Sequence, residues 1–299
     1  MYYMIYAMAC GDDKYMPSVK FQLETAVKRG KVDRTLSFHL NEMDEEFVNK
    51  NQAILEAGGT RRKGCYLWKP YFVVKAMNMI EYGDWLIYMD GGNFYYRNSV
   101  RKTIKWMEDH QIDIAGSRTG HYQEKDWTKR DVFIALDLDR EPYISRTQCR
   151  AGFLILRKTD KVLAFLNEWL THCQNYQLIT DCPNAYGKEN YEGFSEHRHD
   201  QSILSLLMWR DRIPNVEQFP LPYFVVYHHS FLVSVKDIKK MQRHKFASDI
   251  WNGIKKHDIG WILYVIREQR KEWYWYQKFH QKKLYSKSVG RSANAGGHS

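Results

Sequence analysis

One short segment ends in a carboxylate followed by two glycines, Asp90-Gly91-Gly92. It comes directly after residues 86–89, an apolar run that is long enough for a buried strand and too short for a helix. The glycines let the backbone turn sharply and let another molecule approach closely. In an open α/β sheet, ligands bind at the carboxyl ends of the strands, where a carboxylate can hold a divalent cation or a sugar hydroxyl. The structural alternative is that Asp90 caps a turn before Asn93.

A second segment, residues 60–70, combines four cations and two large aromatic side chains in a loop that contains a glycine. Pro70 fits the first turn of a helix that we expect to run to about residue 80. Arg62, Lys63 and Lys69 at this helix start are candidates to bind a diphosphate, because guanidinium groups and helix N-termini both attract anions. The alternative is a solvated basic loop with Trp68 in the core.

A third segment, residues 197–201, reads His-Arg-His-Asp-Gln and precedes an apolar helix expected over residues 202–209. Asp200 therefore stands at or near a helix N-terminus, where we expect the helix dipole to stabilise its ionised form. Such a carboxylate suits accepting a proton or binding a hydroxyl. An ordinary N-cap aspartate is the structural alternative, and both roles can hold at once.

A pair of adjacent histidines, His228 and His229, ends a last strand expected over residues 220–227. Neighbouring side chains in a strand point to opposite faces, so at most one of the two faces the Asp90 edge. A lone inward histidine is more often a hydrogen-bonded core residue than a metal ligand.

The order of the remaining elements predicts an α/β fold, because strands and helices alternate from the N-terminus and imply a parallel sheet with right-handed crossovers. Residues 117–150 and 177–198 are polar and irregular, although a helix is expected to begin near residue 124 and run to 136. The expected strands lie at residues 2–10, 35–40, 86–89, 112–116, 151–156 and 220–227. The expected helices lie at residues 15–29, 44–57, 70–80, 97–110, 160–173 and 202–209.

Composition limits the cellular setting. The 299 residues carry 45 lysines and arginines against 35 acids, a net charge of +10 that favours anionic partners such as nucleotide phosphates, nucleic acid or a membrane surface. Five cysteines without Cys-x-x-Cys spacing indicate neither a disulfide framework nor a zinc site. The first residues lack the basic start and apolar core of a signal peptide, and no run is long enough to span a membrane. We therefore expect a cytoplasmic protein, for which peripheral binding to a membrane stays open.

The character of the chain changes near residue 236. Residues 236–288 are helical in pattern, basic and rich in tryptophan and tyrosine, which suits either a membrane interface or a helical appendage with a solvated basic face. We expect a catalytic domain over residues 1–235, a basic aromatic extension over 236–288 and a disordered tail over 289–299.

Several segments taken together resemble the nucleotide-diphospho-sugar transferases of the GT-A fold, particularly those that bacteria and large viruses use for surface polysaccharides. Each segment alone is weakly specific, but the set is ordered along the chain. The segments are residues 64–70, 88–92 and 197–202, with weaker support from 124–130 and 151–155. The resemblance implies a Rossmann-like, mostly parallel sheet flanked by helices, with a C-terminal helical appendage.

The resemblance also implies a sugar-nucleotide donor at the carboxyl edge of the sheet and a glycan or lipid-linked glycan acceptor. Asp90 falls on the first carboxylate of the Asp-x-Asp metal motif of the family, and Gly92 stands in place of the second. Mn²⁺ or Mg²⁺ could still be held by Asp90 and the diphosphate, with His228 as a further ligand. Alternatively, the cations of residues 60–70 neutralise the diphosphate without a metal.

Other site residues follow from the same resemblance. Asp200 and Gln201 fall on an acid–amide pair that lies beside the donor sugar. Cys10, Gly91, Gly92 and Trp68 join the donor-binding set. His199 and Trp127 are expected to contact the acceptor or a sugar.

Glycosyl transfer requires charge stabilisation on the leaving nucleoside diphosphate and passes through an oxocarbenium-like state. In an inverting enzyme a carboxylate also removes the proton of the acceptor hydroxyl, and Asp200 is our first candidate for that base, followed by Asp181. In a retaining enzyme, Asp200 and Gln201 would instead position the donor sugar. Two other functions remain open, namely nucleic-acid binding, for which no recognisable module is present, and sugar-nucleotide binding without turnover.

Overall fold

The computed structural model describes residues 3–57, 64–95, 98–220 and 225–226. The chain divides into two units, Met1–Phe231 and Leu232–Ser299. The second unit lies outside the described residues, and with it the expected extension over 236–288 and the tail over 289–299.

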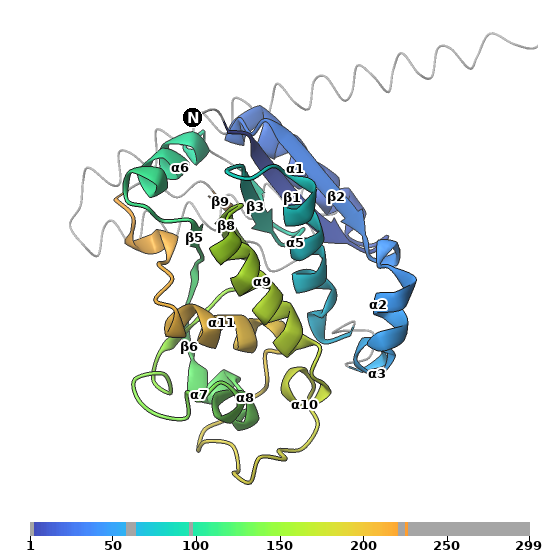
Figure 1. Ribbon diagram of the computed structural model, residues 1–299, viewed down its shortest axis with the longest axis vertical. Coiled ribbons are helices and arrows are strands. Elements are labelled where there is room, and N and C mark those ends of the chain that lie inside the picture. Colours follow the sequence, from blue (N-terminus) through green and yellow to red (C-terminus); the bar gives the residue numbers. More distant parts are fainter. Residues whose placement is uncertain (1–2, 58–63, 96–97, 221–224, 227–299) are drawn as a thin grey trace, which may run out of the picture. The chain divides into compact units, whose positions relative to one another are not determined.

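A five-stranded sheet forms the centre of the first unit, with strand order β2-β1-β3-β8-β5 (Figure 1). Strand β1 pairs in parallel with both β2 and β3, whereas β8 runs antiparallel between β3 and β5. The expected α/β class with a mostly parallel sheet flanked by helices is confirmed. Two smaller antiparallel pairs, β4 with β9 and β6 with β7, lie outside this sheet. The strands are β1 Ile5–Gly11, β2 Arg34–His39, β3 Trp85–Met89, β4 Phe94–Tyr95, β5 Ile114–Ala115, β6 Arg118–Gln123, β7 Thr147–Cys149, β8 Phe153–Arg157 and β9 Val225–Val226.

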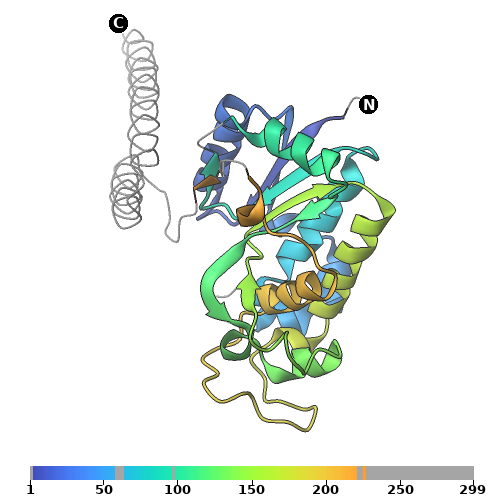
Figure 2. The ribbon, with the colours of Figure 1, turned by 90° about the vertical axis from the view of Figure 1, so that its left-hand side faces the viewer.

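Helices cover both faces of the sheet (Figures 1 and 2). The α-helices are α1 Met16–Thr25, α2 Glu45–Lys50, α3 Gln52–Glu56, α5 Trp68–Met79, α6 Val100–Asp109, α7 Glu124–Trp127, α8 Arg130–Ala135, α9 Asp160–Cys173, α10 Tyr176–Ile179 and α11 Asp200–Arg210. Short 3₁₀ turns lie at Leu40–Glu42, Gly64–Tyr66 and Val216–Gln218, and a π-helical turn at Ala26–Gly30 continues α1.

The side-chain alternation of β3 divides the core into two layers. Leu86 and Tyr88 pack with α5 and α9 on one face of the sheet. Trp85, Ile87 and Met89 pack with α6 on the other face. All five side chains of β3 are fully buried, as the apolar run predicts for a central strand. The strand therefore fixes where the residue that follows it, Asp90, leaves the core.

Two expected helices are broken in the structure. The helix expected over 44–57 divides into α2 and α3 at Asn51, whose side-chain amide donates to the carbonyl of Phe47 at 2.8 Å. A side chain that bonds a backbone carbonyl in this way competes with the helical backbone pattern. The helix expected over 124–136 divides into α7 and α8 at Thr128, where the backbone is extended and the hydroxyl donates to the side chain of Glu124 at 2.7 Å.

Most other boundaries agree with the sequence to within a few residues. Helix α9 begins at Asp160, with Thr159 as its N-cap at 3.3 Å from the amide of Val162, and ends at Cys173 as expected. Helix α5 begins at Trp68, so Pro70 lies in its first turn, where a missing N–H costs nothing.

Candidate functional site

Asp90 is the first residue after β3, at the sheet edge where β1 also ends. Its amide donates to the carbonyl of Gly152 at 3.0 Å, which ties the strand end to the start of β8. The hydroxyl of Tyr88 donates to Asp90 Oδ1 at 2.7 Å. A Cβ on Gly152 would lie 2.5 Å from Asp90 Oδ2, so only glycine leaves room for this carboxylate. The Asp90 side chain is 47% exposed and faces solvent at the edge.

Lys69 joins Asp90 to the start of α11. Its ammonium lies 3.3 Å from Asp90 Oδ1 and 3.2 Å from Asp200 Oδ2. The lysine side chain is 7% exposed and the Asp200 side chain 2%. The three groups therefore form a row from the solvent-facing Asp90 through Lys69 to the buried Asp200. The three sequence segments converge on one place, as the sequence predicts.

Burial decides the protonation behaviour of this row. Removal from water raises the pKa of Asp200 to about 6, because the attraction of Lys69 only partly offsets the cost of burying the carboxylate. Burial alone would lower the pKa of Lys69, but Asp200 and Asp90 together raise it, so the ammonium stays charged. The backbone amide of Gln201 at the helix start lowers the pKa of Asp200, in the direction that the sequence predicts, but burial outweighs it.

Two aromatic side chains, Tyr66 and Trp68, lie beside Lys69. Residues 64–66 all have positive φ angles, 61°, 49° and 61°, which turn the chain before α5. The Lys69 ammonium lies 5.3 Å from the ring centre of Tyr66 and 5.8 Å from that of Trp68. Aromatic faces at this range attract a cation and also suit packing against a sugar or a base.

Cys10 and Tyr88 are buried side chains close to Asp90. Cys10 is buried at the end of β1, and burial followed by the charge of Asp90 raises the pKa of its thiol. The same two causes raise the pKa of the Tyr88 hydroxyl. Both groups therefore stay protonated, and Cys10 acts here as a small buried side chain rather than a nucleophile.

The start of α11 has a strained backbone. His199, the residue before the helix, has φ 52° and ψ −119°, a conformation that a non-glycine residue rarely adopts. Its Nδ1 lies 2.8 Å from the carbonyl of Ile179, which can only accept, so Nδ1 carries a proton. Its Nε2 lies 3.8 Å from Oδ2 of Asp181, whose side chain is 51% exposed. His199 is thus held beside Asp200 with Nε2 toward a solvent-facing carboxylate.

His197 has a structural role. Its Nε2 donates to the carbonyl of Leu178 at 2.8 Å, and its Nδ1 accepts from the amide of Lys129 at 3.2 Å. Both ring nitrogens are therefore used in the core, where the ring is 3% exposed. Together with Lys129, which donates to the carbonyl of Gln177, the two histidines satisfy the last carbonyls of α10.

Gln201 and Trp127 form hydrogen bonds with two other polar residues, Gln148 and Ser202. The Gln201 side-chain amide donates to Gln148 Oε1 at 2.9 Å. The Trp127 carbonyl accepts from Ser202 at 2.8 Å, and its ring packs 5.3 Å from the guanidinium of Arg198. No contact between Trp127 and the Lys69 row is present in the described part of the chain, so its sugar-binding role stays a prediction.

Three predicted site residues, Arg62, Lys63 and His228, lie outside the described residues. Tyr88, Gly152 and Gln148 were not predicted from the sequence, although all three touch predicted residues. Gly152 carried a signal that could have found it, since a glycine at the start of a strand marks a close approach.

The described residues contain no cluster of three or more histidine, cysteine or acidic side chains able to hold a metal. Asp90 is the one predicted ligand among them, and its Oδ1 already accepts from Tyr88 and lies against the Lys69 ammonium. A hard cation prefers several oxygen ligands. The described donor set therefore does not fit a protein-held Mn²⁺ or Mg²⁺.

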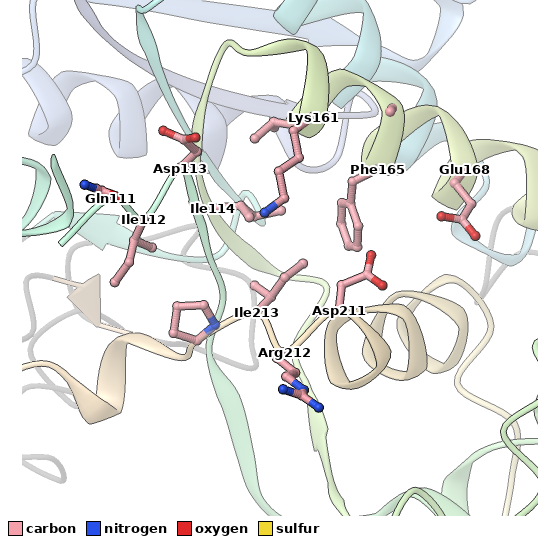
Figure 3. A pocket seen from close by; sticks show the side chains of 13 residues that line it. Gln111, Ile112, Asp113, Ile114, Lys161, Phe165, Glu168, Asp211, Arg212 and Ile213 are labelled. Carbon is pink, nitrogen blue, oxygen red and sulfur yellow. The ribbon is translucent and has the colours of Figure 1, made fainter.

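A cavity of about 300 Å³ lies elsewhere, between β5, α9 and the end of α11. Figure 3 shows that its lining combines apolar side chains, among them Ile114, Phe165 and Ile213, with charged ones such as Lys161 and Asp211. None of the predicted site residues lines it. None of the helices in the described part of the chain is long and apolar enough to cross a bilayer.

No protein-family model and no curated protein matches the sequence. Three solved structures are similar at low identity. Mouse xyloside xylosyltransferase 1 in its apo form is 10% identical, with a TM-score of 0.39 over 71% of this chain and 83% of that chain. A glycosyltransferase involved in glycosylation of the major capsid of PBCV-1 is 10% identical, with a TM-score of 0.31 over 60% and 72%. Core-mannan synthase A from Aspergillus fumigatus in an Mn/GDP form is 8% identical, with a TM-score of 0.37 over 69% and 70%. These likenesses are distant, so the site residues alone carry the functional inference.

Proposed function

We propose that this protein is a glycosyltransferase of the GT-A type, which moves a sugar from a nucleotide-diphosphate donor to a glycan or lipid-linked glycan acceptor. The observation that carries the proposal is the row Asp90–Lys69–Asp200 at the carboxyl edge of β1 and β3. This is the edge at which open α/β sheets bind ligands. A fixed cation between two carboxylates supports both charge stabilisation and hydroxyl binding at one place.

Lys69 is the group that we assign to the leaving nucleoside diphosphate. Its charge is kept by Asp200 and Asp90, so it is already in place when negative charge develops on the phosphate oxygens. The aromatic side chains of Tyr66 and Trp68 limit its movement. In this assignment the buried Asp200 holds Lys69 rather than touching the substrate.

The carboxylate that accepts the acceptor proton must reach solvent. Asp200 was our first candidate, but its side chain is only 2% exposed behind Lys69. Asp181 is 51% exposed and adjoins His199, which makes it the better placed base. His199 Nε2 lies beside this carboxylate, and Gln201 would bind the donor sugar. A retaining enzyme would need neither base, and Asp200 would then serve the donor side only.

We assign the neutralising role to Lys69, because its ammonium is held at the sheet edge by two carboxylates, and this assignment predicts that donor binding does not require Mn²⁺ or Mg²⁺. A sugar-nucleotide binder without turnover is the second candidate, favoured by the glycine at position 92 in place of a second carboxylate.

The test is a thermal-shift screen of UDP- and GDP-sugars against the purified chain, with and without Mn²⁺ or a chelator. A donor at about 100-fold its Kd adds roughly 2.7 kcal/mol of stability. We expect one donor to stabilise the protein equally in both conditions and to be hydrolysed or transferred. Binding without turnover would support the second candidate. Stabilisation by none of the donors, with tight salt-sensitive binding to RNA, would favour the nucleic-acid alternative and refute the proposal.

A further inference from the structure

A fully buried polar network lies behind Gln201 and is not explained by the row of charges at the site. It joins α7, β7 and α11 through Glu124, Thr128, Gln148 and Ser205, each of them 0% exposed. Burying four polar side chains together costs stability unless every hydrogen bond is made. Such a network is therefore expected to serve a purpose that apolar residues would not.

The direction of each hydrogen bond can be followed from Glu124. The hydroxyls of Thr128 and Ser205 both donate to the side chain of Glu124. The oxygen of Thr128 is then left with lone pairs only. It accepts from Gln148 Nε2 at 2.9 Å.

The carbonyl of Trp127 also accepts from Gln148 Nε2, at 3.2 Å. Two acceptors on the same side therefore fix which end of the Gln148 amide carries the nitrogen. Its oxygen must face the other way, where it accepts from Gln201 Nε2 at 2.9 Å. Gln201 in turn must present its own carbonyl oxygen away from the network, and in the described part of the chain that oxygen has no hydrogen-bond partner.

We propose that Gln148 is a positioning residue, which fixes the Gln201 amide so that its carbonyl oxygen accepts a hydrogen bond from a hydroxyl of the donor sugar. This inference rests on the proposed glycosyltransferase function. It makes Gln201 selective for a hydroxyl at that point, because a fixed carbonyl rejects groups that cannot donate.

The structure offers a matched pair of substitutions. Thr128→Val removes the hydroxyl that joins Glu124 to Gln148 Nε2. Ser205→Ala removes the hydroxyl that joins Glu124 to the amide of Cys149, which donates to it at 2.6 Å. Each substitution removes one hydrogen bond to Glu124. Only Thr128→Val also removes a hydrogen bond to Gln148, which contacts Gln201. Gln148→Leu removes the path altogether.

The experiment measures the donor KM, the acceptor KM and kcat for these three variants. Loss of one neutral hydrogen bond corresponds to about a five- to tenfold change, so we expect the donor KM to rise by that factor in Gln148→Leu and less in Thr128→Val. The acceptor KM should stay within about twofold, as should every constant of Ser205→Ala. An equal rise in Ser205→Ala, or an unchanged donor KM in Gln148→Leu, would overturn the proposal.

A second measurement works without any ligand. The side-chain NH₂ signals of Gln201, assigned by their absence in Gln201→Met, report whether its amide is fixed. In the ligand-free protein we expect slow hydrogen exchange and NH₂ shifts displaced from those of a free glutamine amide in the wild type and in Ser205→Ala, and fast exchange with free-amide shifts in Gln148→Leu. Unchanged signals in Gln148→Leu would refute the positioning role even if transfer were observed. If no sugar nucleotide bound the wild type, the proposed function would fail, while this comparison would still decide the role of Gln148 toward Gln201.

Discussion

Lys69 places a positive charge between one exposed and one buried carboxylate. Removing one partner of a buried ion pair leaves the other charge in a poor solvent, which typically costs about 3 to 5 kcal/mol. We therefore predict that Lys69→Met loses about that much unfolding free energy at pH 7.5. The loss should be smaller at pH 5, because Asp200, whose pKa is already raised to about 6, then takes up a proton.

Urea denaturation at the two pH values measures this effect. Lys75→Met is the matched control, because Lys75 lies on the same helix and pairs with the exposed Asp44 at 3.0 Å. Exposed pairs contribute about 0 to 1 kcal/mol, so the control should change little at either pH. A Lys69→Met variant as stable as the control at pH 7.5 would contradict the assigned charge balance.

Glu124 gives a pH dependence of opposite sign to that of an ordinary acidic residue. Burial raises its pKa to about 7, although bonds from Ser205, Thr128 and Gln148 act to lower it. The folded state therefore binds this proton more tightly than the unfolded state does. The stabilising contribution is complete below the unfolded pKa and is lost as pH rises through about 7.

We predict that Glu124→Gln removes this loss. Relative to the wild type, the variant should gain up to about 3 kcal/mol of unfolding free energy between pH 4.5 and pH 8. Urea titrations of both proteins across that range give the difference directly, and other titrating groups cancel in it. A difference that does not vary with pH would mean that Glu124 keeps an ordinary acidity in the folded protein.

At the scale of elements, the sequence predicted what depends on local pattern. The apolar run before Asp90 and the Thr159 cap are local signals, and both elements formed where expected. The break at Asn51 was missed because it depends on one side-chain bond that competes with the helix. The break at Thr128 was missed because that residue belongs to a buried network with Glu124 and the distant Gln148. The raised pKa of Asp200 was missed because burial depends on residues far away in the chain. Local signals thus indicated the candidate site residues, while long-range packing set their surroundings.

The junction of β3 and β8 gives a prediction at this scale. Gly152→Ala would place a Cβ 2.5 Å from Asp90 Oδ2 and 3.0 Å from its Cγ, so the carboxylate must move away from Lys69. We expect at least about a tenfold loss of donor affinity, because the displaced Asp90 carboxylate can no longer accept its charge-assisted hydrogen bond from the donor. Calorimetric titration with the donor found in the screen measures it.

The control for Gly152→Ala is the same substitution made in a protein that already carries Asp90→Ala. In an Asp90→Ala background the obstructing atoms are gone, so adding Gly152→Ala should cost little further affinity. Equal losses in both backgrounds would mean that Gly152 acts through the β8 backbone and not through Asp90.

At the scale of the whole molecule, the net charge is unevenly distributed. Residues 1–231 contain 30 lysines and arginines and 30 acids, whereas residues 232–299 contain 15 against 5. The entire net charge of +10 therefore belongs to the second unit, which also carries four tryptophans. Basic and aromatic residues together suit the interface of an anionic membrane, and a lipid-linked acceptor would be found there. The neutral first unit would then act on a substrate that the second unit brings close.

We predict that the protein sediments with phosphatidylcholine vesicles only when phosphatidylserine is included, and that added salt releases it. Replacing Lys239, Lys240, Lys255 and Lys256 with glutamine should weaken this binding, because each basic residue near an anionic surface contributes about 1 kcal/mol. Four equivalent replacements on the first unit, at Lys20, Lys28, Lys102 and Lys105, are the control and should leave vesicle binding unchanged. Donor binding should not change in either set, since none of the replaced lysines belongs to the row Asp90–Lys69–Asp200. Vesicle binding that is lost equally in both sets would show that the charge of the second unit has no separate role, and salt-sensitive binding to RNA but not to vesicles would place a nucleic acid there instead.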